Sequence, residues 1–424
     1  MKTCILWLFL CIPFLLSAQV DFSTFFTEKS MRFDFLLAGN STDVTVFPMT
    51  TQQEASWAGN RNNLIDKFNY GTYRFRIFDA KTGTLIFAKG FNTLFQEWQT
   101  TAEAQQHDKA FYQAAIFPYP KETIKLEIDA RQRNGRFLNI FQTNIDPKDY
   151  FISKENRETF ETKWIEKNGI PAQKVDIVVL AEGYSQKEKQ KFFDDTQRLC
   201  NYLFTEEPFR SERENFNINA VFTPSLESGT DVPGEHIYRN TRFNSTFYTF
   251  DVPRYLTTTD MKSIYDAAGT VPYDFIYLLV NTDRYGGGGF YNLLTVCTSN
   301  NERSPQVFIH EFGHGFAGLA DEYYTSDVAY EDFYNLKVEP WEPNLTTLVD
   351  FGKKWEAMLD PSTPVPTPRK TEYQNTIGVY EGGGYMSKGI FSPYMNCRMK
   401  SNDSEGFCPV CEKALREMIR VHTE

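Results

Sequence analysis

The sequence predicts an α+β chain with two domains, an antiparallel β-sandwich at the N-terminus followed by an α/β domain with a mixed sheet. Three observations support this fold class. The 424 residues exceed what one ordinary hydrophobic core organises. Short stretches of alternating apolar and polar residues fill the first part of the chain, whereas apolar runs alternate with helical segments after it. Aromatic residues make up 16% of the chain, and they are enriched in strands.

The N-terminal domain is expected over residues 20–147. Its strands alternate apolar and polar side chains with period two, which is typical of sheets with one buried face. The clearest of them are at residues 32–36, 73–78 and 124–128. Residues 79–83 have the composition of a turn, and Asn134 with Gly135 is typical of a tight hairpin. No cluster of catalytic residue types occurs here, which leaves a binding module or a packing partner as the role of this domain.

The second domain is expected over residues 148–424, with a polar connection at residues 146–170. Four apolar runs predict buried strands, and a helical stretch over residues 186–204 follows the first of them. These runs are at residues 175–180, 218–222, 275–280 and 293–297. The glycines at residues 286–289 separate the third and fourth runs and predict a flexible loop or a tight bend.

Residues 1–18 have the composition of a secretory signal peptide. Lys2 supplies the positive start, an apolar run covers residues 5–16, and Ala18 ends a small-residue cleavage site. The apolar run is shorter than the roughly 20 residues that span a membrane, which argues against a membrane anchor. A lipid anchor at Cys11 is less favoured, because the apolar run before it is very short. The chain is therefore expected to be secreted, periplasmic or at the cell surface.

Five cysteines remain after the signal peptide, and in an oxidising compartment an odd number leaves at least one without a disulfide. They are Cys200, Cys297, Cys397, Cys408 and Cys411. A disulfide from Cys397 to Cys408 or Cys411 is predicted. A structural zinc at these three thiols is less favoured, because no fourth ligand lies close to them in the sequence.

The residues that carry chemistry lie in one predicted helix. Ser304 and Pro305 predict its start, since serine caps free amides and proline suits the first helical position. Four residues advance a helix by about 400°, so His310 and His314 share one face about 6 Å apart along the axis. Two imidazoles so placed can bind one zinc ion at about 2.0–2.1 Å each. Glu311 lies beside them and is the candidate general base.

A catalytic zinc has a third protein ligand and one open position for water. Asp321 is the candidate ligand, but on a continuous helix it would lie about 10 Å beyond His314, too far for one coordination sphere. Gly318 resolves this, because a left-handed glycine can end the helix and turn the chain back. Glu322 is the alternative ligand, followed by Glu331. Only this cluster has ligand spacing, which predicts one zinc ion per chain.

The motif is close to the metzincin pattern His-Glu-x-x-His-x-x-Gly-x-x-His. It departs from that pattern twice, since one extra residue precedes Gly318 and Asp321 replaces the last histidine. Metzincins also place a methionine under the metal, for which Met399 is the first candidate and Met395 the second. Residues 310–324 as a whole resemble the signature of the family of metallopeptidases named after bacterial IgA peptidases.

The resemblance to that family covers most of the mature chain. Its segments are residues 57–66 and 97–101 in the first domain and residues 228–233, 281–289, 342–346, 380–385 and 407–411 in the second. It implies a zinc endopeptidase with a separate N-terminal β-domain and a metzincin-like catalytic domain of the zincin type.

The expected activity is hydrolysis of peptide bonds in a protein or peptide substrate. Zinc would polarise the scissile carbonyl, and Glu311 would take a proton from water and pass it to the leaving amine. Tyr385 is the candidate donor to the developing oxyanion, with Tyr323 and Tyr394 as alternatives. The net charge of −11 and the lack of a dense run of Lys or Arg argue against nucleic acid as a partner.

Two other classes of function stay open at this point. One is a zinc amidase acting on cell-wall peptides, which a comparison of turnover on unfolded protein and on muropeptides would separate from a peptidase. The other is a non-catalytic binding protein on a peptidase fold. The intact Glu311 argues against the second class, because a protein without catalysis has no need of the general base.

Overall fold

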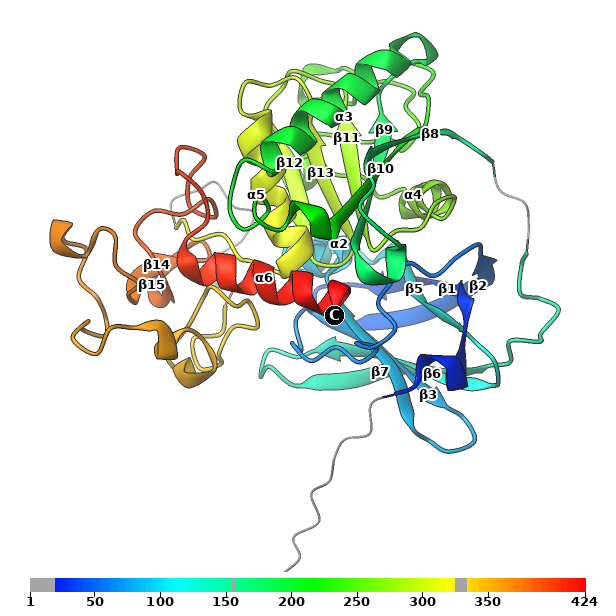
Figure 1. Cartoon of the computed structure of the whole chain (residues 1–424), viewed down its shortest axis with the longest axis horizontal. Helices are drawn as coiled ribbons and strands as arrows, with labels where there is room; N and C mark the ends of the chain where they lie inside the picture. Colours follow the sequence, from blue (N-terminus) through cyan, green and yellow to red (C-terminus); the bar gives the residue numbers. More distant parts are fainter. Residues whose placement is uncertain (1–19, 155–157, 325–333) are drawn as a thin grey trace, which may run out of the picture.

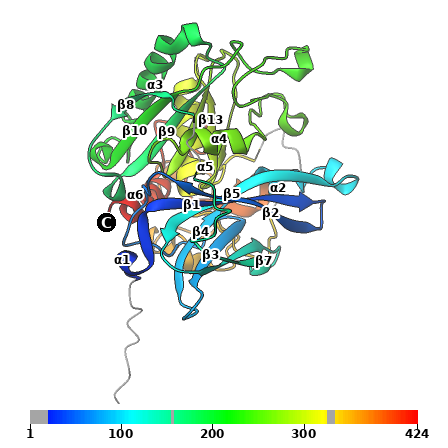
Figure 2. The ribbon, with the colours of Figure 1, turned by 90° about the vertical axis from the view of Figure 1, so that its right-hand side faces the viewer.

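The computed structural model describes residues 20–154, 158–324 and 334–424 (Figures 1 and 2). Antiparallel sheets come first along the chain, and a mixed sheet with helices follows. The C-terminal helix lies between these two parts in the view of Figure 1. The predicted succession of antiparallel strands and then a mixed sheet with helices is confirmed at this level.

The strands among residues 20–154 form two antiparallel sheets that share one hydrophobic core. One sheet, in the order β2-β1-β5, contains β1 (Phe26–Gly39), β2 (Val44–Glu54) and β5 (Lys109–Pro120). The other, in the order β4-β3-β6-β7, contains β3 (Tyr73–Asp79), β4 (Leu85–Phe91), β6 (Ile124–Arg131) and β7 (Phe137–Ile145). The period-two pattern explains them, since every second residue of β3 is buried. Two short helices, α1 (Phe22–Phe25) and α2 (Leu94–Trp98), accompany these strands.

The mixed sheet has the strand order β12-β13-β11-β9-β10-β8. Its inner strands are parallel, and they are β9 (Val175–Glu182), β10 (Phe216–Phe222), β11 (Phe275–Val280) and β13 (Leu294–Thr298). Antiparallel strands close both edges, β8 (Glu161–Glu166) and β12 (Gly287–Phe290). The four strands expected from the apolar runs are therefore present.

Two elements differ from the prediction. The polar connection expected at residues 146–170 contains β8, whose side chains are mostly exposed because it is an edge strand. The glycine run expected as a loop or bend lies mostly in β12. A Cβ added to Gly289 would lie 2.4 Å from the carbonyl oxygen of Glu311, so the strand needs glycine where the helix approaches it. This packing outweighs the weak strand propensity of glycine. The strand was not predictable from the local sequence pattern, because the pattern does not reveal the contact with the helix.

The helices of the second part are α3 (Lys189–Leu203), α4 (Met261–Ala268), α5 (Ser304–Ala317) and α6 (Pro409–Thr423). Alternating strand residues face different cores. Ile177 and Leu279 belong to the core that contains α3, α5 and α6, whereas Val178 and Leu278 belong to the core shared with α4 and the N-terminal sheets. The helix expected over residues 186–204 is confirmed as α3, preceded by one 3-10 turn. Near the C-terminus, β14 (Tyr380–Gly383) and β15 (Met386–Ser392) form a hairpin.

Polar contacts join the two parts. The fully buried Arg32 in β1 forms an ion pair with Asp266 of α4, at 2.6 Å between Nη2 and Oδ1. Asn60 and Asn63 donate hydrogen bonds to the carbonyl oxygens of His422 and Val421 at the end of α6, at 3.1 and 3.0 Å. Because the last carbonyls of a helix have no partner within it, these asparagines fix the end of α6.

None of the helices among the described residues is long and apolar enough to cross a membrane. The expected signal peptide at residues 1–18, with Cys11, lies outside the described residues.

Candidate active site and metal centre

Helix α5 carries both histidines and packs on the mixed sheet through apolar side chains. Phe308 stacks on Tyr277 of β11 with ring centroids 4.1 Å apart. The helix begins at Ser304 after Arg303, which makes no side-chain cap. The prediction that Ser304 caps the helix is wrong, because its side chain is buried and lies 3.3 Å from the hydroxyl of Thr298. Pro305 lies in the first turn, as expected.

His310, His314 and Asp321 converge on one point. The Nε2 atoms of His310 and His314 lie 3.0 and 3.3 Å from Oδ1 of Asp321 and 3.1 Å from each other. Each Nδ1 faces a backbone carbonyl instead, that of Arg398 at 2.9 Å for His310 and that of Leu319 at 2.6 Å for His314. A carbonyl only accepts, so each Nδ1 carries a proton, and a neutral ring in this orientation would present its Nε2 lone pair to a metal.

Gly318 brings Asp321 to the histidines. Its φ of 62° is in the left-handed region, which confirms the predicted positive φ. Its amide donates to the carbonyl of His314 at 3.0 Å, and the next amide donates to the carbonyl of Gly313 at 3.2 Å, which ends the helix. A Cβ at position 318 would lie 2.7 Å from the ring of Trp341. Conformation and space therefore both require glycine here.

The donor set fits a metal cation. Two imidazole nitrogens and a buried carboxylate oxygen face one another at close range, an arrangement that a metal cation stabilises. Without a metal, protonation of the histidines would stabilise the same close contact. Burial by itself lowers the pKa of His314, but the negative charge of Asp321 outweighs burial and raises this pKa to about 9. Burial opposes ionisation of Asp321, yet the charge of His314 holds its pKa well below the ordinary value.

A cavity of about 440 Å³ opens on His310, His314 and Asp321 and on Glu311. Glu311 lies against β12, where a Cβ added to Gly287 would lie 2.9 Å from its Oε1. Burial raises the pKa of Glu311, although the neighbouring histidines partly offset this effect. The carboxyl predicted as general base therefore lies in the same cavity as the three candidate ligands.

Tyr385 is the candidate oxyanion donor and also lines the cavity. Its hydroxyl donates a hydrogen bond to Oδ2 of Asp321, and its ring packs against Tyr323 with centroids 5.4 Å apart. Tyr323 lines the cavity too, whereas Tyr394 packs at the margin of the second hydrophobic core. The catalytic role of Tyr385 stays a prediction, and its contact with Asp321 is a finding.

Met399, proposed for the methionine position, is fully buried beneath α5. A Cβ added to Gly313 would lie 2.8 Å from its Sδ, so the methionine packs directly on the helix between the two histidines. Its carbonyl accepts a hydrogen bond of 2.8 Å from the amide of Glu322.

The N-terminal part contributes to the cavity through residues that sequence reasoning did not single out as functional. Asn92 and Glu97 line it. Glu97 accepts a hydrogen bond from the hydroxyl of Tyr255, and burial raises its pKa to about 7. The sequence signal was present, because Glu97 opens one of the segments that carry the family resemblance.

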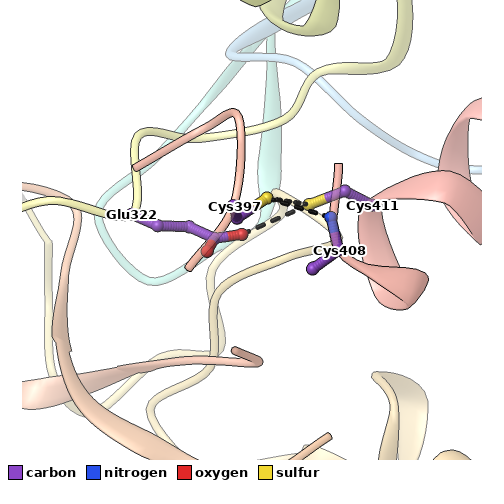
Figure 3. Close-up of side chains that lie close together, drawn as sticks. All are labelled: Glu322, Cys397, Cys408 and Cys411. Carbon is purple, nitrogen blue, oxygen red and sulfur yellow. Dashed lines mark hydrogen bonds between the residues drawn. The ribbon is translucent and has the colours of Figure 1, made fainter. Parts of the chain in front are cut away.

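Glu322, the alternative third ligand, does not belong to the group formed by the histidines and Asp321. It lies with Cys397, Cys408 and Cys411 in a separate buried cluster (Figure 3). The predicted disulfide is wrong, because all three thiols are free and the Sγ atoms of Cys397 and Cys411 are 3.8 Å apart, against about 2.05 Å in a disulfide. Sequence spacing missed Glu322 as a neighbour of these thiols, since 75 positions separate it from Cys397. The further alternative, Glu331, lies outside the described residues.

Comparison with known families identifies the chain. Residues 164–376 and 369–419 match the profile described as IgA Peptidase M64, and residues 21–142 match the profile described as Peptidase M64 N-terminus. Comparison with curated proteins gave no match. The family matches cover most of the sequence and confirm the resemblance of residues 310–324 to this family. The chain belongs to the IgA peptidase M64 family of metallopeptidases.

Proposed function

We propose that the protein is a secreted zinc endopeptidase whose metal ligands are His310, His314 and Asp321. One observation carries the proposal, namely two imidazole nitrogens and a carboxylate oxygen that lie within 3.0–3.3 Å of one another and face one point. Three nitrogen and oxygen ligands with a cavity beside them match a catalytic zinc site, which keeps one position open. Membership of a metallopeptidase family supports a protein or peptide as the substrate.

The roles of the chain's own groups follow from their places. Zinc bound by these ligands would supply a Lewis acid that polarises the scissile carbonyl and makes water more acidic. Glu311 takes the proton from water and passes it to the leaving amine. Its raised pKa suits this exchange, because a buried carboxyl accepts and releases a proton closer to neutral pH. Tyr385 is the proposed donor to the oxyanion, since its hydroxyl already lies against a metal ligand.

The two backbone carbonyls behind the histidines hold the rings in place. Arg398 and Leu319 accept from the Nδ1 atoms, and these hydrogen bonds fix both the tautomer and the direction of each Nε2. Tyr385 does the same for Asp321 through its second carboxylate oxygen. All three ligands are thus oriented by neighbours before a metal arrives.

The finer architecture is part of the proposal. We place an N-terminal β-sandwich domain at residues 20–147 and a metzincin-like zincin domain at residues 148–424, with secretion directed by residues 1–18. The shared core of the two antiparallel sheets supports the sandwich. The buried Met399 under the helix of the two histidines supports the metzincin-like interpretation.

The substitution Glu311→Gln tests the proposal. It keeps shape and hydrogen-bonding capacity but removes the base, so zinc content should persist while kcat/KM on an unfolded protein substrate falls about 100-fold or more. Glu302→Gln is the matched control, because Glu302 is exposed just before the same helix and should leave activity unchanged. Full activity in Glu311→Gln would refute the general-base role. Turnover of muropeptides without turnover of protein would indicate a zinc amidase and not a peptidase.

A further inference from the structure

A second group of side chains of metal-ligating types lies close to the candidate active site and separate from it. Cys397, Cys408, Cys411 and Glu322 each offer one ligand atom, and these atoms all lie within 4.8 Å of one another (Figure 3). Cys411 Sγ is 3.2 Å from Oε1 of Glu322 and 3.8 Å from the Sγ of Cys397. All four side chains are at most 2% exposed. None of them lines the cavity that contains His310.

We propose that these four residues bind a second zinc ion, in a closed structural site. Thiolates are ligands that zinc favours, and four protein ligands without access to a cavity are the mark of a structural rather than a catalytic site. The proposal goes beyond the peptidase function, and it replaces the expectation of one zinc per chain with two inequivalent ions.

The local fold explains why the four ligands meet. Cys408 is the residue that precedes α6, and Cys411 lies in the first turn of that helix, so the Cys-Pro-Val-Cys segment presents two thiols from one helix start. The amide of Cys408 donates to the Sγ of Cys397 at 3.2 Å, a contact that stabilises negative charge on this sulfur. Glu322 arrives from the turn that Gly318 creates after α5.

A disulfide among the thiols does not explain why the carboxylate of Glu322 is buried beside them. A disulfide between any two of the thiols would leave the third thiol and a fully buried carboxylate without a bound metal. Oε2 of Glu322 is buried and has no hydrogen-bond partner among the described residues. The amino group of Lys400 attracts this carboxylate electrostatically, but its hydrogen bonds go to Ser392 and to the carbonyl of Tyr394, at 3.2 and 3.5 Å. A divalent cation bound by Glu322 and the thiolates accounts for all four groups.

Glu322 is oriented as a ligand by a buried asparagine. Nδ2 of Asn344 donates to Oε1 of Glu322 at 3.0 Å and to the carbonyl of Ala320 at 2.9 Å, while Oδ1 of Asn344 accepts from the amide of Ala320 at 2.8 Å. Asn344 is fully buried. An outer residue that fixes the direction of a ligand in this way is typical of protein metal sites.

The proposed second site adjoins two segments that position the proposed ligands of the first site. Asp321 and Glu322 are adjacent in the chain, and the amide of Glu322 donates to the carbonyl of Met399. Arg398, between Cys397 and Met399, provides the carbonyl that orients His310. An ion held by Cys397 and Glu322 would therefore fix the backbone of both segments that position the catalytic ligands.

The direct test uses the full chain with His310→Ala and His314→Ala combined, which removes the active-site ligands but none of the proposed ones. Elemental analysis should find about one zinc per chain, and X-ray absorption should give sulfur neighbours at about 2.3 Å. Absence of zinc, or a zinc without sulfur neighbours, would overturn the proposal. So would a disulfide among these cysteines, detected by mass spectrometry after alkylation of the unfolded, unreduced chain.

A second measurement keeps the proposal falsifiable if cysteine variants fail to fold. Co²⁺ added to the metal-free chain that carries the two histidine substitutions should produce a thiolate-to-metal charge-transfer band in the near ultraviolet, and its absence would count against the site. Among variants that fold, Cys411→Ser should lose this band, whereas Cys200→Ser should keep it, because Cys200 is a buried thiol outside the cluster. Equal bands in both variants would refute the ligand assignment.

Discussion

Asp321 and Glu322 are consecutive residues whose carboxylates enter two different clusters of metal-ligating side chains. Oδ1 of Asp321 lies 3.0 Å from Nε2 of His310, whereas Oε1 of Glu322 lies 3.2 Å from Sγ of Cys411. The turn at Gly318 delivers both carboxylates to their places. The segment that contains these two residues thus lies between the proposed catalytic and structural zinc sites.

Tyr385 has two candidate roles, and Tyr385→Phe separates them. If the hydroxyl stabilises the oxyanion, kcat should fall about 100- to 1,000-fold while zinc affinity changes little. If the hydroxyl mainly orients Asp321, zinc affinity should fall and excess zinc should restore kcat. Zinc titration combined with steady-state kinetics distinguishes the outcomes. Unchanged kcat and unchanged zinc affinity would show that the hydroxyl of Tyr385 has neither role.

Gly318→Val should weaken zinc binding and lower the free energy of unfolding by more than about 1 kcal/mol. A β-branched residue resists the left-handed backbone, and its Cβ would meet Trp341. Gly83→Ala is the matched control, since Gly83 also has a positive φ but an added Cβ meets nothing within 4 Å. This control should lose about 1–2 kcal/mol of unfolding free energy and keep full zinc binding. Full zinc affinity in Gly318→Val would show that the turn does not position Asp321.

Glu97 tests whether the N-terminal part shapes the substrate site. Glu97→Ala removes its hydrogen bond with Tyr255, worth about 1 kcal/mol, at the wall of the cavity. KM for a peptide substrate should rise about fivefold, with zinc content unchanged. The exposed Glu122, in the same part of the chain but away from the cavity, provides the control Glu122→Ala. Equal KM values in all three proteins would contradict a role for this part in substrate binding.

Asp176 should make stability depend on pH. Burial and the charge of Asp274 raise its pKa in the folded protein. The unfolded chain therefore loses this proton at lower pH than the folded chain, and the stabilisation present below the ordinary aspartate pKa is lost as pH rises. The slope approaches about 1.4 kcal/mol per pH unit for one proton. Denaturant unfolding between about pH 5 and 7 should show a flatter slope in Asp176→Asn, and parallel slopes would contradict this assignment.

Local patterns were sufficient to predict much of this fold. The period-two stretches became β3 and β6, and the apolar runs became the parallel strands of the mixed sheet. His310 and His314 were predictable because helix geometry alone places them on one face. The positive φ at Gly318 followed from the need to return Asp321 to the histidines.

Long-range packing explains what the sequence did not reveal. β12 is a strand of glycines because α5 lies against it, and no local signal records that contact. Glu322 joins Cys397, Cys408 and Cys411 only through the folded chain, so spacing favoured a disulfide instead. Glu97 reaches the cavity from the N-terminal sheets, and its chemistry depends on the neighbouring Tyr255.

The central claim is that His310, His314 and Asp321 bind one zinc ion in the active site. Anomalous diffraction at the zinc absorption edge, on crystals of the full mature chain, tests it most directly. A peak at about 2.0–2.2 Å from Nε2 of both histidines and from a carboxylate oxygen of Asp321 is the predicted result. No peak there, or a peak more than about 4 Å from Asp321, would contradict the account.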